Sequence, residues 1–431
     1  MRILHRAFSA GIALAVLTLP TIAFAQEGLN TGNTSWVLTS TALVLFMTLP
    51  GLALFYGGLV RSQNVLSVLM HVIFIACMAS VVWLVAGYAL AFGDGGGVNA
   101  YVGGLDKAFL RGVGVDAMAG DIPESVFFMF QLTFAVITPA LIVGAYVERM
   151  KFAAVIIFTF LWLLFVYSPV THWVWGGGWL MEMGVRDFAG GLVVHTTAGV
   201  SALVIAVVLG ARKGFPGKVS LPHNPGMAMT GACMLWVGWF GFNAGSALSA
   251  GGSAGMAMTV THIAAATASM VWMGIEWMRY GKPTLVGLVT GTIAGLATVT
   301  PASGYIGPVG GLICGAAAGV ACYYITQYVK QTLKIDDSLD VFAVHAAGGM
   351  LGILLVSFLA AEGFQGLGLE MSIASHFLVQ LTGVVATVIW AGVLTFVFLK
   401  IAQALVGIRV SEEDETEGLD ITSHGERGYE L

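Results

Sequence analysis

The sequence predicts an all-α polytopic membrane protein with eleven transmembrane helices arranged as an inverted five-plus-five repeat. The chain of 431 residues is 58% hydrophobic and only 10% charged, whereas soluble domains carry about 25% charged residues. Apolar segments long enough to cross a bilayer follow one another along the chain. Two of them, five spans apart, share an acid near the start and a histidine further in. This repetition predicts the two halves.

The first 25 residues are typical of a cleaved signal peptide. They begin with Arg2 and Arg6, run through an apolar stretch and end in small residues up to Ala25. An uncleaved first helix is the alternative interpretation. Pro20 and the small residues near the end favour cleavage, so the mature chain is expected to begin at Gln26.

Residues 26–402 are expected to form one membrane domain, and residues 403–431 a polar, acidic cytoplasmic tail. The loop over residues 93–121 is expected to be a flexible connector. The predicted spans cover residues 36–60, 65–92, 122–146, 152–171, 188–210, 226–247, 254–278, 284–302, 305–329, 341–361 and 372–402.

Basic residues in the loops predict that the N-terminus lies outside and the C-terminus inside, because Lys and Arg are enriched in the inner loops of membrane proteins. The loops expected outside hold Lys107, Arg111 and Arg186. The loops expected inside hold Arg61, Arg149, Lys151, Arg212, Lys213, Lys218, Arg279, Lys282, Lys330, Lys334, Lys400, Arg409 and Arg427. A multi-pass protein of the cell (inner) membrane is therefore expected. The net charge of −5 argues against nucleic-acid binding.

Two acid and histidine pairs lie in the fifth and tenth spans. Asp187 precedes His195, and Asp340 precedes His345, with small residues after each histidine. Because five is an odd number of spans, the first pair is approached from outside and the second from inside, so both histidines are expected near the midplane. A polar side chain at that depth is costly and usually lines a substrate path. The alternative is that each histidine is a core residue bonded to a backbone carbonyl.

Little else in the sequence suggests catalysis. No two histidines are spaced as a helical metal pair, and no Gly-x-Ser-x-Gly motif is present. We therefore expect no enzyme activity, no cofactor and no metal, although a metal held by His195 and His345 stays an alternative. What remains is a pore or carrier. In it, two neutral imidazoles pass hydrogen bonds to a small polar solute or relay a proton.

Aromatic residues gather at the ends of several spans, among them Phe134, Trp175, Trp239 and Phe242. An interfacial belt accounts for most of them. The second interpretation is a vestibule in which ring faces attract a small cation by about 0.5–2 kcal/mol. Ser246 adds a hydroxyl acceptor close to Phe242 in the sequence.

A series of motifs runs in order from about residue 36 to residue 425. They include FQLTFAVITPALIVGAYVERMKF (130–152), HWVWGGG (172–178), DFAGGLVVHTTAG (187–199), GWFGFNAGS (238–246) and DDSLDVFAVHAAGG (336–349). These motifs resemble the ammonium transporter family, which includes the methylammonium permeases and the Rhesus proteins. The HWVWGGG motif is more similar to the bacterial-type ammonium transporters than to the Rhesus branch.

The resemblance implies an eleven-helix homotrimer with one pore per subunit. It implies that Phe134, Trp175 and Ser246 form an outer recruitment site. A gate of two rings, Phe134 and Phe242, is implied below that site. Asp187 is implied to shape the recruitment site from nearby without touching the solute.

The resemblance further implies that His195 and His345 line the pore as twin histidines. The implied function is ammonium transport: the ion, or methylammonium, is recruited at the aromatic site, deprotonated and passed through a hydrophobic pore. A passive channel for ammonia or carbon dioxide and an ammonium sensor are the alternatives. The tail over 407–431 is similar to the family's cytoplasmic tail, which docks PII-type regulatory proteins. An acidic tail that is merely solvated is the other interpretation.

Overall fold

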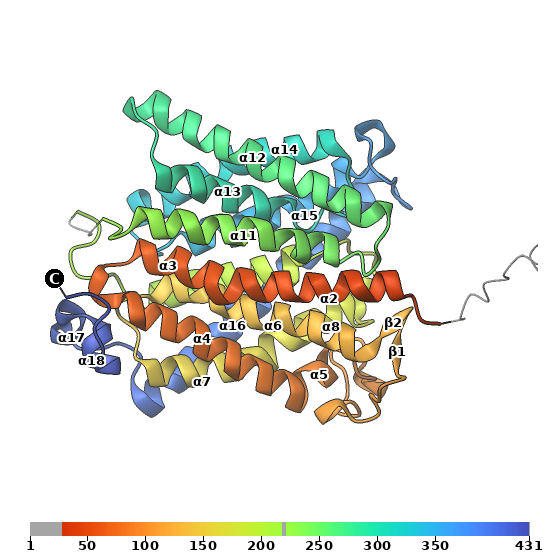
Figure 1. Cartoon of the computed structure of the whole chain (residues 1–431), viewed down its shortest axis with the longest axis horizontal. Helices are drawn as coiled ribbons and strands as arrows, with labels where there is room; N and C mark the ends of the chain where they lie inside the picture. The colour runs from red at the N-terminus through yellow and green to blue at the C-terminus, as the bar shows by residue number, and fades with distance from the viewer. Residues whose placement is uncertain (1–27, 218–220, 431) are drawn as a thin grey trace, which may run out of the picture.

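The protein is a bundle of long helices that run roughly along one common axis (Figure 1). The computed structural model describes residues 28–217 and 221–430, so the expected signal peptide at 1–25 lies outside the described residues. The C-terminal helices lie at one end of the bundle, and the short hairpin β1 (Met118–Ala119) and β2 (Ile122–Pro123) lies at the other. Following the orientation predicted from the sequence, the first is called the inner end or inner face and the second the outer end.

The first half of the chain forms five helical runs, several of which change pitch through a π-helical or 3-10 turn. They are α2 (Thr31–Phe46), η1 (Met47–Leu52) and α3 (Ala53–Leu59); η2 (Ser62–Asn64), α4 (Val65–Val82), η3 (Trp83–Gly87) and α5 (Tyr88–Phe92); α6 (Glu124–Tyr146); α7 (Phe152–Trp162), η6 (Leu163–Tyr167), α8 (Ser168–Trp175) and α9 (Trp179–Glu182); and η7 (Gly191–Thr196) with α10 (Thr197–Leu209).

The second half repeats this organisation and adds a last long helix and the tail. Its elements are α11 (Pro225–Gly245), α12 (Gly252–Tyr280), α13 (Leu285–Val299), α14 (Pro308–Gln327) with η8 (Tyr328–Thr332), η9 (Phe342–Ala347) with α15 (Gly348–Leu359), α16 (Ile373–Val406), α17 (Glu412–Glu417) and α18 (Leu419–His424). Short turns in the loops are η4 (Gly96–Val98), η5 (Ala108–Leu110) and η10 (Glu362–Phe364).

Local sequence signals explain where several helices begin. Asn224 caps α11, because its Oδ1 accepts a hydrogen bond from the backbone N–H of Met227 at 2.9 Å, and Pro225 follows at a position where no backbone donor is needed. Thr284 and Ser372 cap α13 and α16 in the same way. These caps satisfy donors that a bilayer cannot satisfy.

Every predicted span overlaps one of these helical runs, and the prediction of a multi-pass all-α membrane protein is confirmed. Among the described residues, nine helices are long and apolar enough to cross a membrane. α13, with 15 residues, is too short to be one of these nine helices, and α11 is not one of them either. The count of eleven spans therefore stays a prediction that depends on these two helices.

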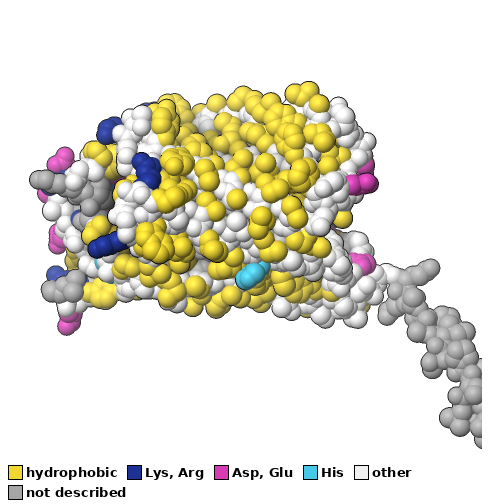
Figure 2. All heavy atoms as spheres, turned by 90° about the horizontal axis from the view of Figure 1, so that it is seen from above, with side chains coloured by type: hydrophobic (Ala, Val, Ile, Leu, Met, Phe, Trp, Pro, Cys, Tyr) yellow, Lys and Arg dark blue, Asp and Glu magenta, His cyan; other side chains and the backbone are white. Residues whose placement is uncertain are grey.

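The surface agrees with a position in lipid. Figure 2 shows hydrophobic side chains over the middle of the bundle and charged side chains at its two ends. Large apolar side chains such as Val81 and Met270 are more than half exposed. A water-soluble protein rarely leaves such a broad apolar surface uncovered, whereas a bilayer covers it.

The two halves meet where two half-helices begin from opposite ends of the bundle. η7 follows Asp187 at the outer end, while η9 begins where the backbone N–H of Leu339 donates to Gly144 O at the inner end of α6. α10 packs against η9, and α15 packs against η7. This reciprocal packing supports the predicted inverted repeat.

The acid of the second half that occupies the place of Asp187 is Asp337. The prediction that Asp340 is the counterpart of Asp187 was wrong. Asp337 precedes His345 by the same eight positions that separate Asp187 from His195. Its Oδ2 accepts from the backbone N–H of Phe342 at the start of η9, at 2.7 Å. Asp340 instead has a positive φ of 63° and forms an ion pair with Lys330 at 2.7 Å. Spacing to the histidine, and not nearness to it, identifies the equivalent residue.

A buried charge cluster joins the inner loops. Arg149 is fully buried, and its guanidinium donates to Ala145 O at 2.8 Å, Asp336 O at 2.7 Å and Ser338 Oγ at 2.6 Å. Both carboxylate oxygens of Asp336 accept from Arg212 at 2.9 Å. Burial alone would raise the pKa of Asp336, but its bonds to Arg212 hold that pKa below its usual value. Loss of one partner would leave a buried charge uncompensated, so the cluster fixes these loops together.

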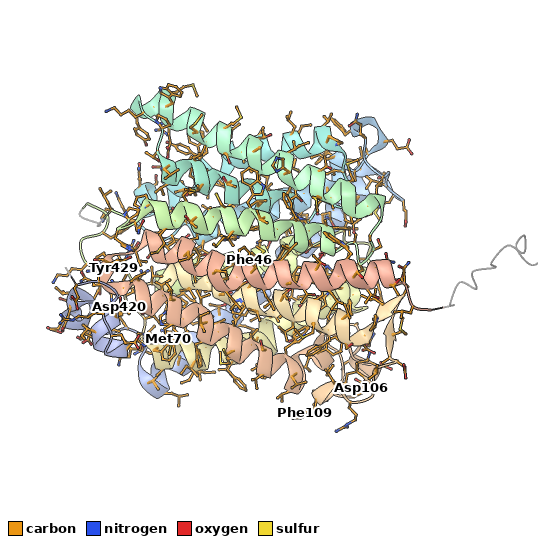
Figure 3. All side chains as sticks on the ribbon, viewed as in Figure 1. Phe46, Met70, Asp106, Phe109, Asp420 and Tyr429 are labelled. Atoms are coloured by element: carbon orange, nitrogen blue, oxygen red, sulfur yellow. The ribbon has the colours of Figure 1, made fainter. Side chains whose placement is uncertain are left out.

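The acidic tail, in which Figure 3 labels Asp420 and Tyr429, folds back onto the inner face. The carboxylate of Asp420 accepts from the backbone N–H groups of Ser67 at 2.7 Å and Leu66 at 3.1 Å, so a tail residue caps the start of α4. The Asn64 side chain accepts from the backbone N–H of Leu419 at 2.8 Å. The tail is therefore a packed part of the inner face in this structure and not merely a solvated chain.

Close packing between the halves depends on glycine at two positions. A Cβ on Gly199 would lie 2.3 Å from the backbone N of Ala346, and a Cβ on Gly349 would lie 2.8 Å from Cβ of His195. No real Cβ tolerates either distance, so any larger residue must push the two half-helices apart. Small residues of this kind let membrane helices approach closely.

We expect Gly199→Ala to destabilise the protein by about 1–3 kcal/mol, because the neighbour in the way is backbone and cannot rotate aside. The matched control is Gly392→Ala on α16, where the new Cβ would meet Val200 Cγ1 at an ordinary 3.6 Å. The measurement is the thermal unfolding midpoint of the purified protein in detergent. Equal midpoints for the two variants would show that Gly199 is not needed for the approach.

Candidate functional site

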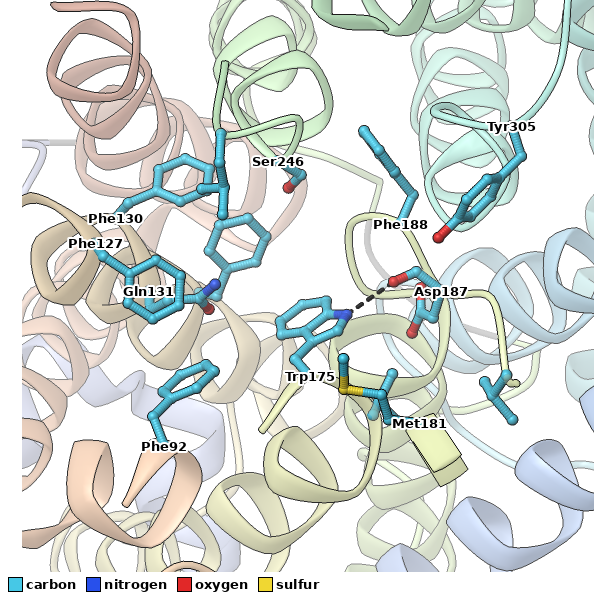
Figure 4. A pocket seen from close by; sticks show the side chains of 14 residues that line it. Phe92, Phe127, Phe130, Gln131, Trp175, Met181, Asp187, Phe188, Ser246 and Tyr305 are labelled. Atoms are coloured by element: carbon cyan, nitrogen blue, oxygen red, sulfur yellow. Dashed lines mark hydrogen bonds between the residues drawn. The ribbon is translucent and has the colours of Figure 1, made fainter. Parts of the chain in front are cut away.

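The outer end of the bundle contains a pocket of about 350 Å³ lined mainly by aromatic rings (Figure 4). The sequence-predicted residues Phe134 of α6, Trp175 of α8 and Ser246 at the end of α11 all line it, and so does Asp187. The structure therefore brings together residues that are more than 100 positions apart in the chain. Lining residues that the sequence did not indicate are Phe92, Gln131, Phe188, Leu248 and Tyr305.

Asp187 shapes this pocket through its backbone. Its carbonyl oxygen accepts from Nε1 of Trp175 at 2.8 Å, the dashed line in Figure 4, so it fixes the plane of the indole. Its carboxylate accepts from the four backbone N–H groups of residues 190–193 at 2.6–3.3 Å. Burial raises the pKa of Asp187, and these four donors oppose the rise. The carboxylate is thus occupied by the start of η7 and is not free to bind a solute.

Two stacked rings lie at the inner limit of the pocket. The ring centroids of Phe134 and Phe242 are 4.4 Å apart, with 33° between the planes, and both side chains are buried. The edge of Trp175 meets Phe134 at 5.7 Å and 85°. Phe134 therefore belongs both to the pocket and to the stack.

Ser246 offers an acceptor to the pocket. Its Oγ donates its own hydrogen to the carbonyl oxygen of Phe242 at 2.8 Å. A hydroxyl carries one donor and two lone pairs, so this bond leaves the oxygen able to accept from a bound N–H group.

His195 and His345 lie behind the phenylalanine stack and bond to each other. Their Nδ1 atoms are 3.2 Å apart, so one ring donates and the other accepts. The two rings are nearly parallel, with 5.2 Å between centroids, and the His195 ring stacks on Phe242 at 6.0 Å. The alternative that each histidine is bonded to a backbone carbonyl does not fit this geometry. Within 28–217 and 221–430, Nε2 of His195 has no hydrogen-bond partner.

Trp239 is a neighbour of the pair, although the sequence suggested only an interfacial belt or a cation–π vestibule for it. Its indole stacks on His195 at 5.5 Å, with 23° between the planes, and its Nε1 donates to Thr300 Oγ1 at 2.9 Å. The sequence does contain a signal for this position. Trp239 lies three positions before Phe242 and therefore shares a helix face with it. Trp239 forms a rigid apolar wall beside the imidazole.

A second pocket of about 380 Å³ opens at the inner end. It is lined by charged side chains of Arg212, Lys330 and Asp340 as well as by apolar ones. The outer pocket is rich in aromatic rings, whereas the inner pocket contains charged side chains. In the described part of the chain, no three His, Cys, Asp or Glu side chains are grouped as metal ligands.

Similar sequences match nearly the whole length of this chain. A family model described as Ammonium Transporter Family matches residues 35–429. The ammonium transporter of Aquifex aeolicus (strain VF5) is 44% identical over 425 residues, covering 98% of this chain and 98% of the relative. The ammonium transporter of Bacillus subtilis (strain 168) is 44% identical over 404 residues, covering 93% and 98%.

Solved structures share the fold. A protein described as Sensor Amt Protein superposes with a TM-score of 0.85 at 29% identity, covering 91% of this chain and 98% of that chain. Mep2 of Saccharomyces cerevisiae superposes with a TM-score of 0.81 at 33% identity, covering 90% and 89%. The match over residues 35–429 and the 44% identity across nearly the full length show that the chain belongs to the ammonium transporter family.

Proposed function

We propose that this chain transports ammonium by binding the ion in the outer pocket, removing its proton and passing ammonia between two rings to the histidine pair. The observation that carries the proposal is the continuous series of rings from Trp175 through Phe134 and Phe242 to His195. Family membership supports transport, and the ring series supports this route.

The outer pocket suits a small cation that donates hydrogen bonds. Ring faces of Trp175 and Phe134 would each attract the ion by about 0.5–2 kcal/mol, and Ser246 Oγ has lone pairs for one N–H group. An uncharged solute gains nothing from the rings. The pocket therefore selects the ammonium ion over ammonia.

The route beyond the pocket does not suit a charge. An unpaired ion moved from water into an apolar medium loses tens of kcal/mol of hydration in the idealised limit, and a few cation–π contacts cannot restore it. Phe242 and Trp239 offer only rings, and both histidines are buried. The ion therefore leaves its proton behind and continues as neutral ammonia.

The histidine pair supports a separate path for that proton. If His195 carries its hydrogen on Nδ1, its Nε2 is an acceptor, and Nδ1–H donates to Nδ1 of His345. A proton arriving at Nε2 of His195 moves the shared hydrogen across and releases one from Nε2 of His345. No carboxylate or metal is needed, and no fixed charge is left in the pore.

Ammonium sensing is the second candidate, because the Sensor Amt Protein has the same fold at 29% identity over 91% of this chain. A passive channel for ammonia or carbon dioxide is the third. A sensor moves little solute, and a gas channel carries no charge. An electrical current evoked by ammonium is therefore expected of a transporter of the ion and of neither alternative.

We expect ammonium to evoke a saturable inward current in proteoliposomes. Trp175→Leu should raise the half-saturating ammonium concentration about 2- to 30-fold, because it removes one ring face worth about 0.5–2 kcal/mol. Trp277→Leu is the matched control, since Trp277 is 57% exposed on α12 and does not line the pocket. An unchanged concentration dependence in Trp175→Leu would reduce this tryptophan to a belt residue. Absence of current in wild type would contradict transport of charge.

Substitutions of the histidine pair should separate relay from selectivity. His195→Ala should lower the ammonium current at least about tenfold, because it removes a proton carrier without adding a charge. His195→Asp or His345→Asp should admit potassium, because a carboxylate can repay part of the cost of dehydrating the cation. Currents in ammonium and in potassium solutions are the measurement. Unchanged flux and unchanged potassium exclusion in all three variants would show that the imidazoles are packing residues.

The oligomeric state and the processing of the chain are further parts of the proposal. We infer a homotrimer from family membership and cleavage after Ala25 from the composition of the first 25 residues. Native mass spectrometry of the purified protein reads the subunit number and the chain mass together. A monomer, or a chain that retains Met1, would contradict the respective inference.

The tail is proposed to dock a PII-type regulatory protein. Supporting this, the tail packs on the inner face through contacts with Asn64 and Ser67, while its acids Glu412, Glu413 and Glu426 are exposed. A partner would meet a folded surface made of the tail and the inner loops together. It would not meet a loose peptide.

Deleting residues 410–431 should abolish co-purification with a PII-type protein while the chain remains in the membrane. The control is Asp420→Asn, which keeps the whole tail and an acceptor at the start of α4. Binding that survives the deletion would assign the contact to the inner loops alone.

A further inference from the structure

Gln131 is a buried polar side chain in the apolar helix α6. Only 8% of its surface is exposed, and within 28–217 and 221–430 its Oε1 has no hydrogen-bond partner. Buried polar groups in proteins nearly always have a partner, because an acceptor taken out of water without one costs free energy. The amide of Gln131 therefore keeps an unused acceptor, and its surroundings indicate what that acceptor binds.

The unused acceptor belongs to the wall of the outer pocket. Gln131 lines that pocket, and Figure 4 shows its amide directed towards Trp175. It lies three positions before Phe134 and so shares a face of α6 with that ring. Of the buried side-chain atoms without a partner in the described chain, Oε1 of Gln131 is the one whose residue lines this pocket. The broad terminal torsion of a glutamine lets the amide turn its oxygen towards the pocket.

The other polar groups of the pocket have less to offer a cation. The carboxylate of Asp187 already accepts from four backbone N–H groups. Ser246 Oγ donates to the carbonyl oxygen of Phe242 and keeps lone pairs for one N–H group. A tetrahedral ammonium ion has four N–H bonds. The ring faces of Trp175 and Phe134, together with Ser246, engage three of them and leave one.

We propose that Oε1 of Gln131 accepts the remaining N–H of the ammonium ion and is a specificity-determining residue of the outer pocket. The inference rests on the proposed function of that pocket. A hydrogen bond from a cation to a carbonyl oxygen is charge-assisted and is stronger than one between neutral groups. Because the amide has no net charge, it holds the ion without adding a fixed counter-charge that would retain it.

Ammonium-evoked currents in proteoliposomes test the function of the acceptor. Gln131→Met has a similar length and no acceptor, and we expect it to raise the half-saturating ammonium concentration about tenfold or more. The maximal current should change less than about twofold, because loss of an interaction made in binding alone leaves the later steps intact. Gln131→Glu keeps an acceptor and should saturate at or below the wild-type concentration. Gln403→Met is the matched control, since Gln403 is exposed on α16 and does not line the pocket.

The outcomes separate this inference from transport itself. A wild-type current together with an unchanged half-saturating concentration in Gln131→Met would overturn the inference and leave ammonium transport standing. A rise of the same size in Gln403→Met would also overturn it, because the effect would then not belong to the pocket.

Infrared difference spectroscopy tests the contact without relying on transport. The full-length protein carries glutamine labelled with ¹³C at the side-chain carbonyl, and spectra in ammonium chloride are compared with spectra in sodium chloride at equal ionic strength. Wild type should show a labelled carbonyl band that ammonium moves to lower frequency, and Gln131→Met should lack this change. No ammonium-dependent band assignable to Gln131 would refute the proposal.

If Gln131→Met fails to fold, Gln131→Glu carries the test together with the labelled wild type. The glutamate variant should show an ammonium-dependent change in a carboxyl band and should saturate at or below the wild-type concentration. A folded glutamate variant that shows no such band and needs more ammonium than wild type would equally overturn the assignment.

Discussion

The hydrogen bond between the Nδ1 atoms of His195 and His345 is the interaction on which the rest of this structure depends. It forms only because Gly199 and Gly349 let two half-helices approach to backbone contact. Without it, each imidazole would be a buried polar group, at a cost of about 1–3 kcal/mol. The same close approach leaves no room for a charged residue between the two rings. The close packing that stabilises the fold would therefore also keep charged residues out of the proposed pore.

Much of the membrane architecture could be predicted from the sequence, because hydropathy and length report directly on spans. The histidines were also predictable, since a polar side chain in an apolar segment stands out. The choice between Asp337 and Asp340 could not be made in the same way, because the segment DDSLD offers three acids within five positions. Only three-dimensional geometry shows that Oδ2 of Asp337 meets the Phe342 N–H while Asp340 turns towards Lys330.

The walls of the outer pocket were less predictable than its centre. Tyr305 and Phe188 come from loops between spans, and hydropathy says nothing about which loop folds over which. For Trp239 the sequence left the interfacial belt and the cation–π vestibule open, since an aromatic residue near the end of a span lies in the belt in most membrane proteins. The packing of the tail could not be predicted from its composition either. An acidic segment has the same composition whether it is solvated or, as for Asp420, caps a helix.

The joining of the two halves at the histidine pair has a consequence for biosynthesis. The chain emerges from the ribosome from its N-terminus, so His195 enters the membrane about 150 residues before its partner. Until the η9 segment inserts, His195 has no imidazole partner and Gly199 has no half-helix to pack against. A nascent or prematurely terminated chain of this length therefore lacks the histidine pair, and under the proposed function it would not conduct while the protein is being made.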